Sequence, residues 1–190
     1  MGFERVDLPH GFSLEVPSHW KVVTREFLDA TKEKYEELDK NPKKLSVLFM
    51  VAERDSEGNT LASIRISFRP KSIIKKQFML AVAPQSVFDY EAESYMAGAA
   101  EANRQMGFYD LLMTNAKGRK VRVAGRYAMS VTYDSSSAKR KIHNGHHELI
   151  LLSNTNDEDR FVIFSTWGDA PYAKDIHDHI IDSIRLSGEE

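Results

Sequence analysis

Phe12-Ser13-Leu14-Glu15-Val16-Pro17-Ser18-His19-Trp20 is the stretch of this chain that decides its fold. Apolar and polar residues alternate over its first five positions, as they do in a strand with one buried face. The proline ends that strand, and we expect the tryptophan to be buried at the start of a second short strand. Far along the chain, Ile176, Ile180 and Ile184 recur every four residues and predict the buried side of a closing amphipathic helix.

Paired strands are predicted between these two ends. Residues 45–52 are apolar on both parities, which indicates a strand that is covered on both faces. A turn at 56–59 joins it to a strand at 60–68, and we expect the two to form an antiparallel hairpin. Residues 146–153 and 161–167 are expected to pair in the same way across the polar segment between them.

Two further strands are predicted in the second half of the chain. The first covers residues 111–115 and is followed by a turn at Gly118. The second alternates from Val121 to Tyr133, and Gly125 predicts a bend within it. The run Ser135-Ser136-Ser137 is predicted to be a turn or a loop.

Three helices are predicted. The first covers residues 24–39, and the second begins at Ser86 as its cap and ends at Gly107. The third has Asp169 as its cap and a proline in its first turn. Strands interrupted by helices in this order predict an α+β domain, with helices on both faces of one antiparallel sheet. The length of 190 residues favours a single domain over residues 1–190.

Composition excludes several classes of protein. The chain has no cysteine, so disulfide scaffolds, thiolate nucleophiles and thiolate metal sites are ruled out. A formal net charge of -2 argues against nucleic-acid binding, which needs a basic face. No stretch of the sequence approaches the ~20 apolar residues that a transmembrane helix requires. The sequence also lacks a glycine-rich phosphate loop and the Gly-x-Ser-x-Gly elbow of the α/β-hydrolases.

The first 20 residues contain no charged start followed by an apolar run, so we expect no signal peptide. Met1-Gly2 fits two origins: a cloning scar on a mature region whose leader was removed, or the native start of a cytosolic protein. Export to the periplasm and a cytoplasmic location therefore both stay open.

The order of these elements resembles the α/β/α sandwich of the PsbP family, the extrinsic subunit of the oxygen-evolving photosystem. It is also similar to the Ran-binding nuclear import factors of the same fold and to exported bacterial proteins of unknown function. Residues 12–20, 123–128, 172–174 and 180–185 carry the resemblance. The charged helix expected after Trp20 fits the bacterial branch better than the plant branch. The resemblance implies a PsbP-like, non-enzymatic domain that binds a partner.

We expect this partner to be a protein that is bound by shape and charge complementarity, without a cofactor. Basic clusters in predicted loops, at residues 71–76, 117–120 and 139–141, either attract an acidic partner or lipid head groups, or serve solubility. Phe108 and Tyr109 lie just past the second helix and offer an exposed apolar contact. The expected surface consists of His19, Phe108, Tyr109, Arg119, Lys120, Lys139 and His143.

Metal or small-ligand binding by two histidine clusters is the alternative function. Adjacent histidines on a strand, such as His146 and His147, point to opposite faces and do not hold one ion together. Asp175 and His179 lie four residues apart on the closing helix, so they form half of a metal site or a surface ion pair. The candidate ligands are His143, His146, His147, Asp175 and His179.

An enzyme is the third hypothesis, with a site assembled from scattered residues such as Glu148, Asp175 and His179. No catalytic motif supports it, so we expect no enzymatic activity. A pocket that gathers at least two titratable groups is the structural feature that this hypothesis needs. The sequence leaves the oligomeric state open.

Overall fold

The computed structural model describes residues 1–23, 46–70, 77–138, 145–154, 159–170 and 172–187, and the structural statements below concern these residues. The helix predicted at 24–39 lies outside them. The strands are β1 (Phe3–Leu8), β2 (Phe12–Pro17), β3 (Lys21–Val22), β4 (Ser46–Arg54), β5 (Thr60–Arg69), β6 (Leu111–Val123), β7 (Arg126–Ser137), β8 (Gly145–Ser153), β9 (Arg160–Trp167) and β10 (Arg185–Leu186). The helices are a 3-10 turn at Pro9–Gly11, α2 (Gln77–Val82), α3 (Gln85–Gln105) and α4 (Ala173–Asp182).

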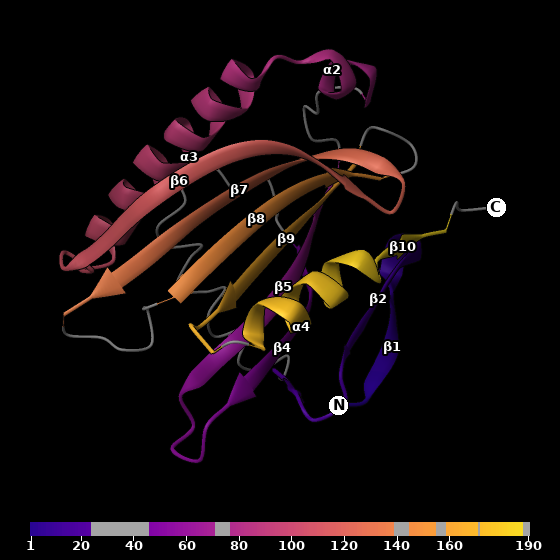
Figure 1. Cartoon of the computed structure of the whole chain (residues 1–190), viewed down its shortest axis with the longest axis vertical. Coiled ribbons are helices and arrows are strands. Elements are labelled where there is room, and N and C mark those ends of the chain that lie inside the picture. Colours follow the sequence, from indigo (N-terminus) through magenta and orange to yellow (C-terminus); the bar gives the residue numbers. More distant parts are fainter. Residues whose placement is uncertain (24–45, 71–76, 139–144, 155–158, 171, 188–190) are drawn as a thin grey trace.

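The larger sheet has seven strands in the order β3-β4-β5-β9-β8-β7-β6, and all neighbouring strands are antiparallel. The two predicted hairpins are confirmed, because β4 pairs with β5 and β8 pairs with β9. Strands β3 and β6 form the two edges. The long hairpin of β6 and β7 therefore lies at the opposite end of the sheet from β4, the neighbour of β3 (Figure 1).

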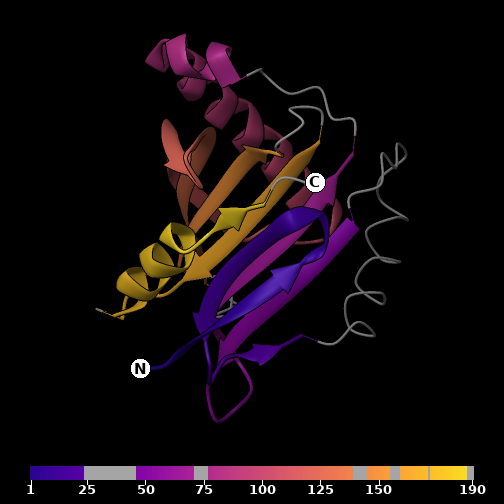
Figure 2. The same cartoon turned by 90° about the vertical axis from the view of Figure 1, so that its right-hand side faces the viewer.

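The smaller sheet joins the two ends of the described chain in the order β1-β2-β10 (Figure 2). Phe12 and Leu14 of β2 are buried, as the alternation of that strand predicts. Trp20 is 8% exposed and Ile184 is 0% exposed, so their predicted burial is confirmed. Strand β10 follows α4 directly and pairs antiparallel with β2, which holds the helix beside the N-terminal strands.

Alternate residues of β9 pack into two different apolar clusters. Phe161 and Ile163 join the cluster that includes β2 and Ile180 of α4. Val162 and Phe164 pack against the cluster that includes Phe88 of α3. Helix α4 contacts β2 and β9, whereas α3 contacts β6 and β7. The predicted α+β class with an antiparallel sheet is confirmed.

The hairpin of β6 and β7 differs from the prediction. Gly118 lies inside β6 and makes no turn. It is a glycine for another reason: α3 passes so close that a methyl group there would overlap the backbone oxygen of Phe88. The turn lies at Ala124 and Gly125, whose φ angles are 50° and 74°. Two successive residues with positive φ form the two-residue turn that suits the twist of a hairpin. Gly125 therefore reverses the chain between two strands and does not bend one.

The ends of several elements were also predicted wrongly. Ser135-Ser136-Ser137 is the end of β7, paired with the start of β6. Helix α3 begins after Pro84 and α4 after Tyr172, and neither has a side-chain cap, so Ser86 and Asp169 do not act as caps. Gly107 does follow the end of α3, with a φ angle of 80°. None of the helices described has the length and apolar composition to cross a membrane.

Candidate functional site

The sheet face that packs against α4 has an apolar half and a polar half. On β5 and β9, residues such as Ile64 and Ile163 pack with the smaller sheet and α4. On β6, β7 and β8 the same face is apolar near the hairpin turn, where Ala128 and Leu152 join that cluster, and polar farther along the strands. Among the described residues, no helix or strand other than α4 lies over this polar part (Figure 1). We call this polar half the open face. By register it comprises Leu112, Thr114, Lys117, Arg119 and Val121 of β6, Ser130, Thr132 and Asp134 of β7, and His146, Glu148 and Ile150 of β8.

A buried carboxylate anchors the open face. Glu148 is 3% exposed, and its Oε2 lies 3.1 Å from Nε2 of His177 on α4. Its Oε1 accepts hydrogen bonds from Nη2 of Arg119, at 3.0 Å, and from the Ser130 hydroxyl. One side chain of β8 is therefore tied to β6, β7 and α4 together. A charge this deeply buried is stable only when it is paired in this way.

Burial by itself raises the pKa of Glu148. Hydrogen bonds from His177, Ser130 and Arg119 outweigh that effect and lower the pKa to about 2. Glu148 is therefore charged at neutral pH. It holds the Arg119 side chain, which is 56% exposed, at the outer edge of the sheet.

His177 contacts two further polar side chains. Its Nε2 lies 2.9 Å from the Ser165 hydroxyl, and its Nδ1 lies 3.2 Å from Oδ1 of Asp178. The atom types are those of a Ser-His-Asp triad, but Ser165 is only 2% exposed and no substrate reaches its hydroxyl. The indole of Trp167 stacks on the His177 ring with 4.1 Å between centroids. These contacts orient His177 toward Glu148.

A second histidine lies at the far end of the open face. His146 Nδ1 is 2.6 Å from Oδ1 of Asp134, and its Nε2 is 3.0 Å from Oδ1 of Asp169. The bond to Asp134 is the main reason that the pKa of His146 is raised. Asn115 donates to the other oxygen of Asp134, which lowers the pKa of that aspartate. His146 thereby links β7 to the segment that precedes α4.

A groove runs between α4 and the hairpin of β6 and β7. Two adjoining clefts, of about 270 and 440 Å³, share Arg122, Val123, Ile181 and Asp182 in their linings. The smaller cleft reaches Glu148 and His177, and the larger one ends at the turn of the hairpin. Apolar and charged side chains therefore alternate along the groove, from the hairpin turn to the polar end of the open face. The groove gathers several titratable groups, which is the feature that the enzyme hypothesis needed, but not the pair of Asp175 and His179 proposed for it.

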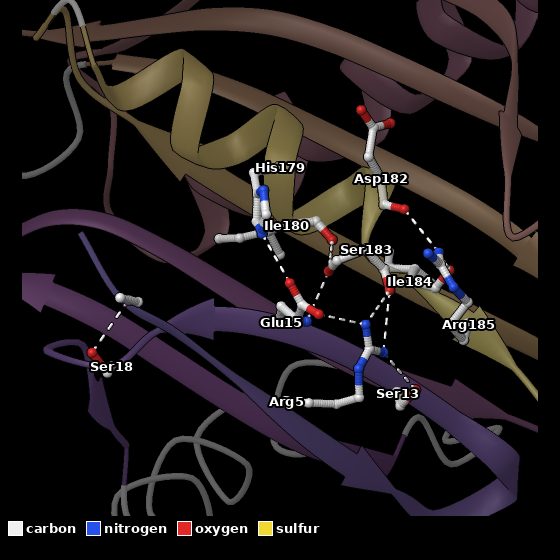
Figure 3. A network of polar contacts seen from close by, with 11 residues as sticks. Arg5, Ser13, Glu15, Ser18, His179, Ile180, Asp182, Ser183, Ile184 and Arg185 are labelled. Carbon is white, nitrogen blue, oxygen red and sulfur yellow. Dashed lines mark hydrogen bonds and ion pairs between the residues drawn. The ribbon is translucent and has the colours of Figure 1, made fainter.

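The opposite flank of α4 is closed by the smaller sheet. His179 Nε2 lies 3.0 Å from Oε2 of Glu15, and the Glu15 backbone nitrogen donates to the Ser183 hydroxyl at 2.7 Å. Arg5 donates to the other carboxylate oxygen of Glu15 at 2.8 Å and reaches the Ser183 carbonyl (Figure 3). His179 is therefore part of a polar contact between strands and helix.

The structure divides the predicted partner surface. Arg119 and Lys120 lie within β6 and not in a loop, because β6 continues through Gly118. Phe108 and Tyr109 come directly before β6, and the Tyr109 side chain is 80% exposed. His19 precedes β3 at the other edge of the sheet and lies 3.8 Å from Glu53, so it does not join the rest. Lys139 and His143 lie outside the described residues.

The predicted metal ligands do not meet in the described part of the chain. His147 stacks on Tyr133, on the face of β8 opposite to His146. His179 binds Glu15, while Asp175 is exposed on α4. The described residues contain no group of three His, Cys, Asp or Glu side chains placed to hold a metal ion.

Sequence reasoning missed His177, Ser130 and Trp167. One signal was available in the sequence. Glu148 points to the same face of its strand as the buried residues Ile150 and Leu152, so it is a charged residue at a core position. A charge there requires a buried partner. Which histidine supplies that partner depends on how α4 crosses the sheet.

Comparisons with known proteins support the fold. No sequence-family profile and no curated protein matches the chain. Its structure is similar to the solution structure of cyanobacterial PsbP (CyanoP) from Synechocystis sp. PCC 6803, with a TM-score of 0.57 over 97% of this chain and 92% of that chain. The two sequences are 12% identical, so the likeness is one of fold alone. The chain has a PsbP-like fold, as its sequence pattern predicted.

Proposed function

We propose that this protein is a non-enzymatic binding domain that recognises a protein partner through the open face. The observation that carries the proposal is that one half of a sheet face is covered by apolar packing while the other half presents fixed charges to solvent. Arg119 on the edge strand lines the groove together with the carboxylates of Asp178 and Asp182 on α4. Lys117 is a second exposed cation on the same face of β6. A surface that carries positive and negative side chains in fixed positions favours a partner whose charges are arranged in the complementary pattern.

Preorganisation supports the proposal. Glu148 and Ser130 hold Arg119 in place before any partner arrives, so less side-chain entropy is lost on binding. Asp134 and Asp169 hold His146 in the same manner. A face that served solubility alone would not need its charges fixed by buried groups.

The proposal includes the arrangement of the helices. We assign α3 and α4 to opposite faces of the larger sheet, as in an α/β/α sandwich. The packing of β9 supports this assignment. Alternate residues of a strand point to opposite faces of the sheet. Ile163 packs in the apolar cluster that includes α4, whereas Val162 packs against the cluster that includes α3. The PsbP-like fold supports a binding role only by analogy, since proteins of one fold differ in function.

The test is site-specific photocrosslinking followed by reconstitution. Benzoylphenylalanine placed at Thr114, on the open face, should give a defined protein adduct in an extract of the source organism. The same residue at Tyr90, exposed on α3, should give none. The crosslinked protein is then identified, purified, and titrated against the unlabelled chain.

A matched pair of charge reversals decides the outcome. Lys117→Glu, on the open face, should weaken the reconstituted complex at least about tenfold, which corresponds to about 1.4 kcal/mol. Lys21→Glu makes the same change on β3, at the opposite edge, and should leave the affinity unchanged. Equal effects of the two substitutions, or adducts only from Tyr90, would overturn the proposal.

A further inference from the structure

We infer that the groove between α4 and the hairpin of β6 and β7 takes an amphipathic helix supplied by the partner. The inference rests on the proposed function and specifies the partner's structure. The groove has apolar groups along its base, from Val121, Val123, Ile150 and Ile181. Its two sides carry charges of opposite sign. Each of these features matches one part of such a helix.

The width of the open face fits one helix. Helix α4 contacts β9, and its His177 side chain reaches Glu148 on the next strand, β8. Strand β6 lies two strands beyond β8. Neighbouring strands are about 4.8 Å apart, so the distance from β8 to β6 is about 10 Å. Packed helices lie about 8–10 Å apart, and a helix is about 10 Å across. A helix beside α4 would therefore lie over β7 and β6.

The flank of α4 that faces the groove is amphipathic. Asp178, Ile181 and Asp182 recur at helical spacing on this flank and line the clefts. Ile181 is half-buried against the core, so it offers an apolar contact that a neighbouring helix can complete. None of the described residues forms an ion pair with the carboxylate of Asp182, which is exposed. The Asp178 carboxylate already contacts Lys174 and His177, so Asp182 is the carboxylate with which a basic residue of an incoming helix would pair.

The opposite side of the groove is basic. Lys117 and Arg119 lie two rungs apart on the same face of β6 and are exposed. Acidic residues on the other side of the incoming helix would reach them. From Lys117 to Val123 the strand extends about 20 Å, the length of about 14 helical residues. The occupant is thus a helix with an apolar stripe, acidic residues along one side and basic residues along the other.

Strand addition to the edge of β6 fits the contacts less well. The side chain of Gln85, from the start of α3, donates to the Gly118 carbonyl at 2.7 Å. Lys120 donates to the Ala81 carbonyl of α2 at 2.6 Å. Helix α3 and the segment before it therefore already contact the middle of β6. A second copy of this chain would bring the cations of two β6 strands together, which is unfavourable.

The experiment uses a synthetic helix of about 16 residues, long enough to fill the groove. The charge-segregated peptide has a leucine stripe, glutamates along one side and lysines along the other. The charge-mixed peptide has the same composition and stripe, but both charges are present on each side. Each is titrated into the ¹⁵N-labelled full chain and followed by NMR. The comparison does not depend on which direction the helix runs.

The expected result is a set of shifts at Val121, Ile181 and their neighbours, with the charge-segregated peptide binding at least about tenfold more tightly, a difference of about 1.4 kcal/mol. Asp182→Lys should remove this preference. Glu93→Lys, which makes an equivalent charge reversal at an exposed position of α3, should leave the preference for the charge-segregated peptide unchanged. Equal binding of the two peptides, shifts outside the groove, or no shifts at about 1 mM peptide would overturn the inference.

The two proposals fail separately. If binding of a purified partner depends on Lys117 but the peptides show no preference, the proposed binding function is supported and the inference of a helical partner is overturned. A partner insensitive to Lys117→Glu would overturn the proposed function, whatever the peptides do.

Discussion

The two flanks of α4 contact the rest of the molecule in different ways. On the closed flank, His179 and Ser183 bind Glu15 of the smaller sheet (Figure 3). On the open flank, Asp178 and Asp182 line a groove, and His177 contacts the sheet through the buried carboxylate of Glu148 and the Ser165 hydroxyl. One short helix therefore fastens the chain ends together on one side and forms the border of a solvent-exposed surface on the other.

The strongest test of this difference is Glu148→Ala. The substitution leaves Arg119, Ser130 and His177 without their shared acceptor. We expect a loss of about 4 kcal/mol in the free energy of unfolding, the range found when one partner of a buried ion pair is removed. Urea denaturation measures it. A loss under about 1 kcal/mol would mean that the network is not what holds the open flank.

Neighbouring isoleucines of α4 sharpen the comparison. Ile180 is 1% exposed in the core, whereas Ile181 is half-buried beside the groove. We expect Ile180→Ala to cost about 3 kcal/mol of stability and Ile181→Ala about 1 kcal/mol. Thermal unfolding of the two variants at one pH compares them directly. Similar losses would show that the open flank is packed as tightly as the core.

The stability of the open flank should depend on acid pH. The folded-state pKa of Glu148 is lowered to about 2 from 4.5. Its contribution is therefore fully present above the unfolded pKa and is lost as the pH falls through the folded pKa. Between about pH 5 and pH 2 the wild type should lose up to about 3 kcal/mol more than Glu148→Gln, as measured by urea unfolding at each pH. Parallel profiles for the two proteins would contradict this assignment.

The smallest expected effect separates two adjacent residues. Ser183 is buried, accepts from the Glu15 backbone and donates to the Ile180 carbonyl. We expect Ser183→Ala to cost about 1 kcal/mol of stability, as for the loss of a buried hydrogen bond. Asp182→Ala, one position earlier on the exposed side, should change stability by less than about 0.5 kcal/mol. Equal losses in chemical denaturation would remove the distinction between the flanks.

Most of the fold follows from patterns in the sequence. The alternation after Phe12 and the spacing of Ile176, Ile180 and Ile184 identify elements whose apolar sides are buried as expected. The hairpin of β6 and β7 was misjudged because Gly118 and Gly125 look alike in the sequence. One is a glycine that a neighbouring helix needs, and the other is a turn with positive φ. Local sequence does not distinguish a close tertiary contact from a turn.

The candidate site was less accessible to sequence reasoning. Arg119 and Lys120 were selected for their charge, but their place within β6 depends on the correct turn. His177 and His179 lie two residues apart on α4 and so project in different directions, and the structure gives them different partners, Glu148 and Glu15. The partner of His177 comes from a strand 29 residues earlier in the chain, and only the crossing of α4 over the sheet brings the two together.

Hydrogen–deuterium exchange of the full chain, with and without the crosslinked partner, tests the central claim most directly. The proposed function places the partner on the open face, so it predicts that the partner protects the amides of β6 and of the α4 segment from Asp178 to Asp182. The amides of β1 and β3 should exchange at unchanged rates. Protection confined to the smaller sheet or to β3, with β6 and α4 unchanged, would contradict the account.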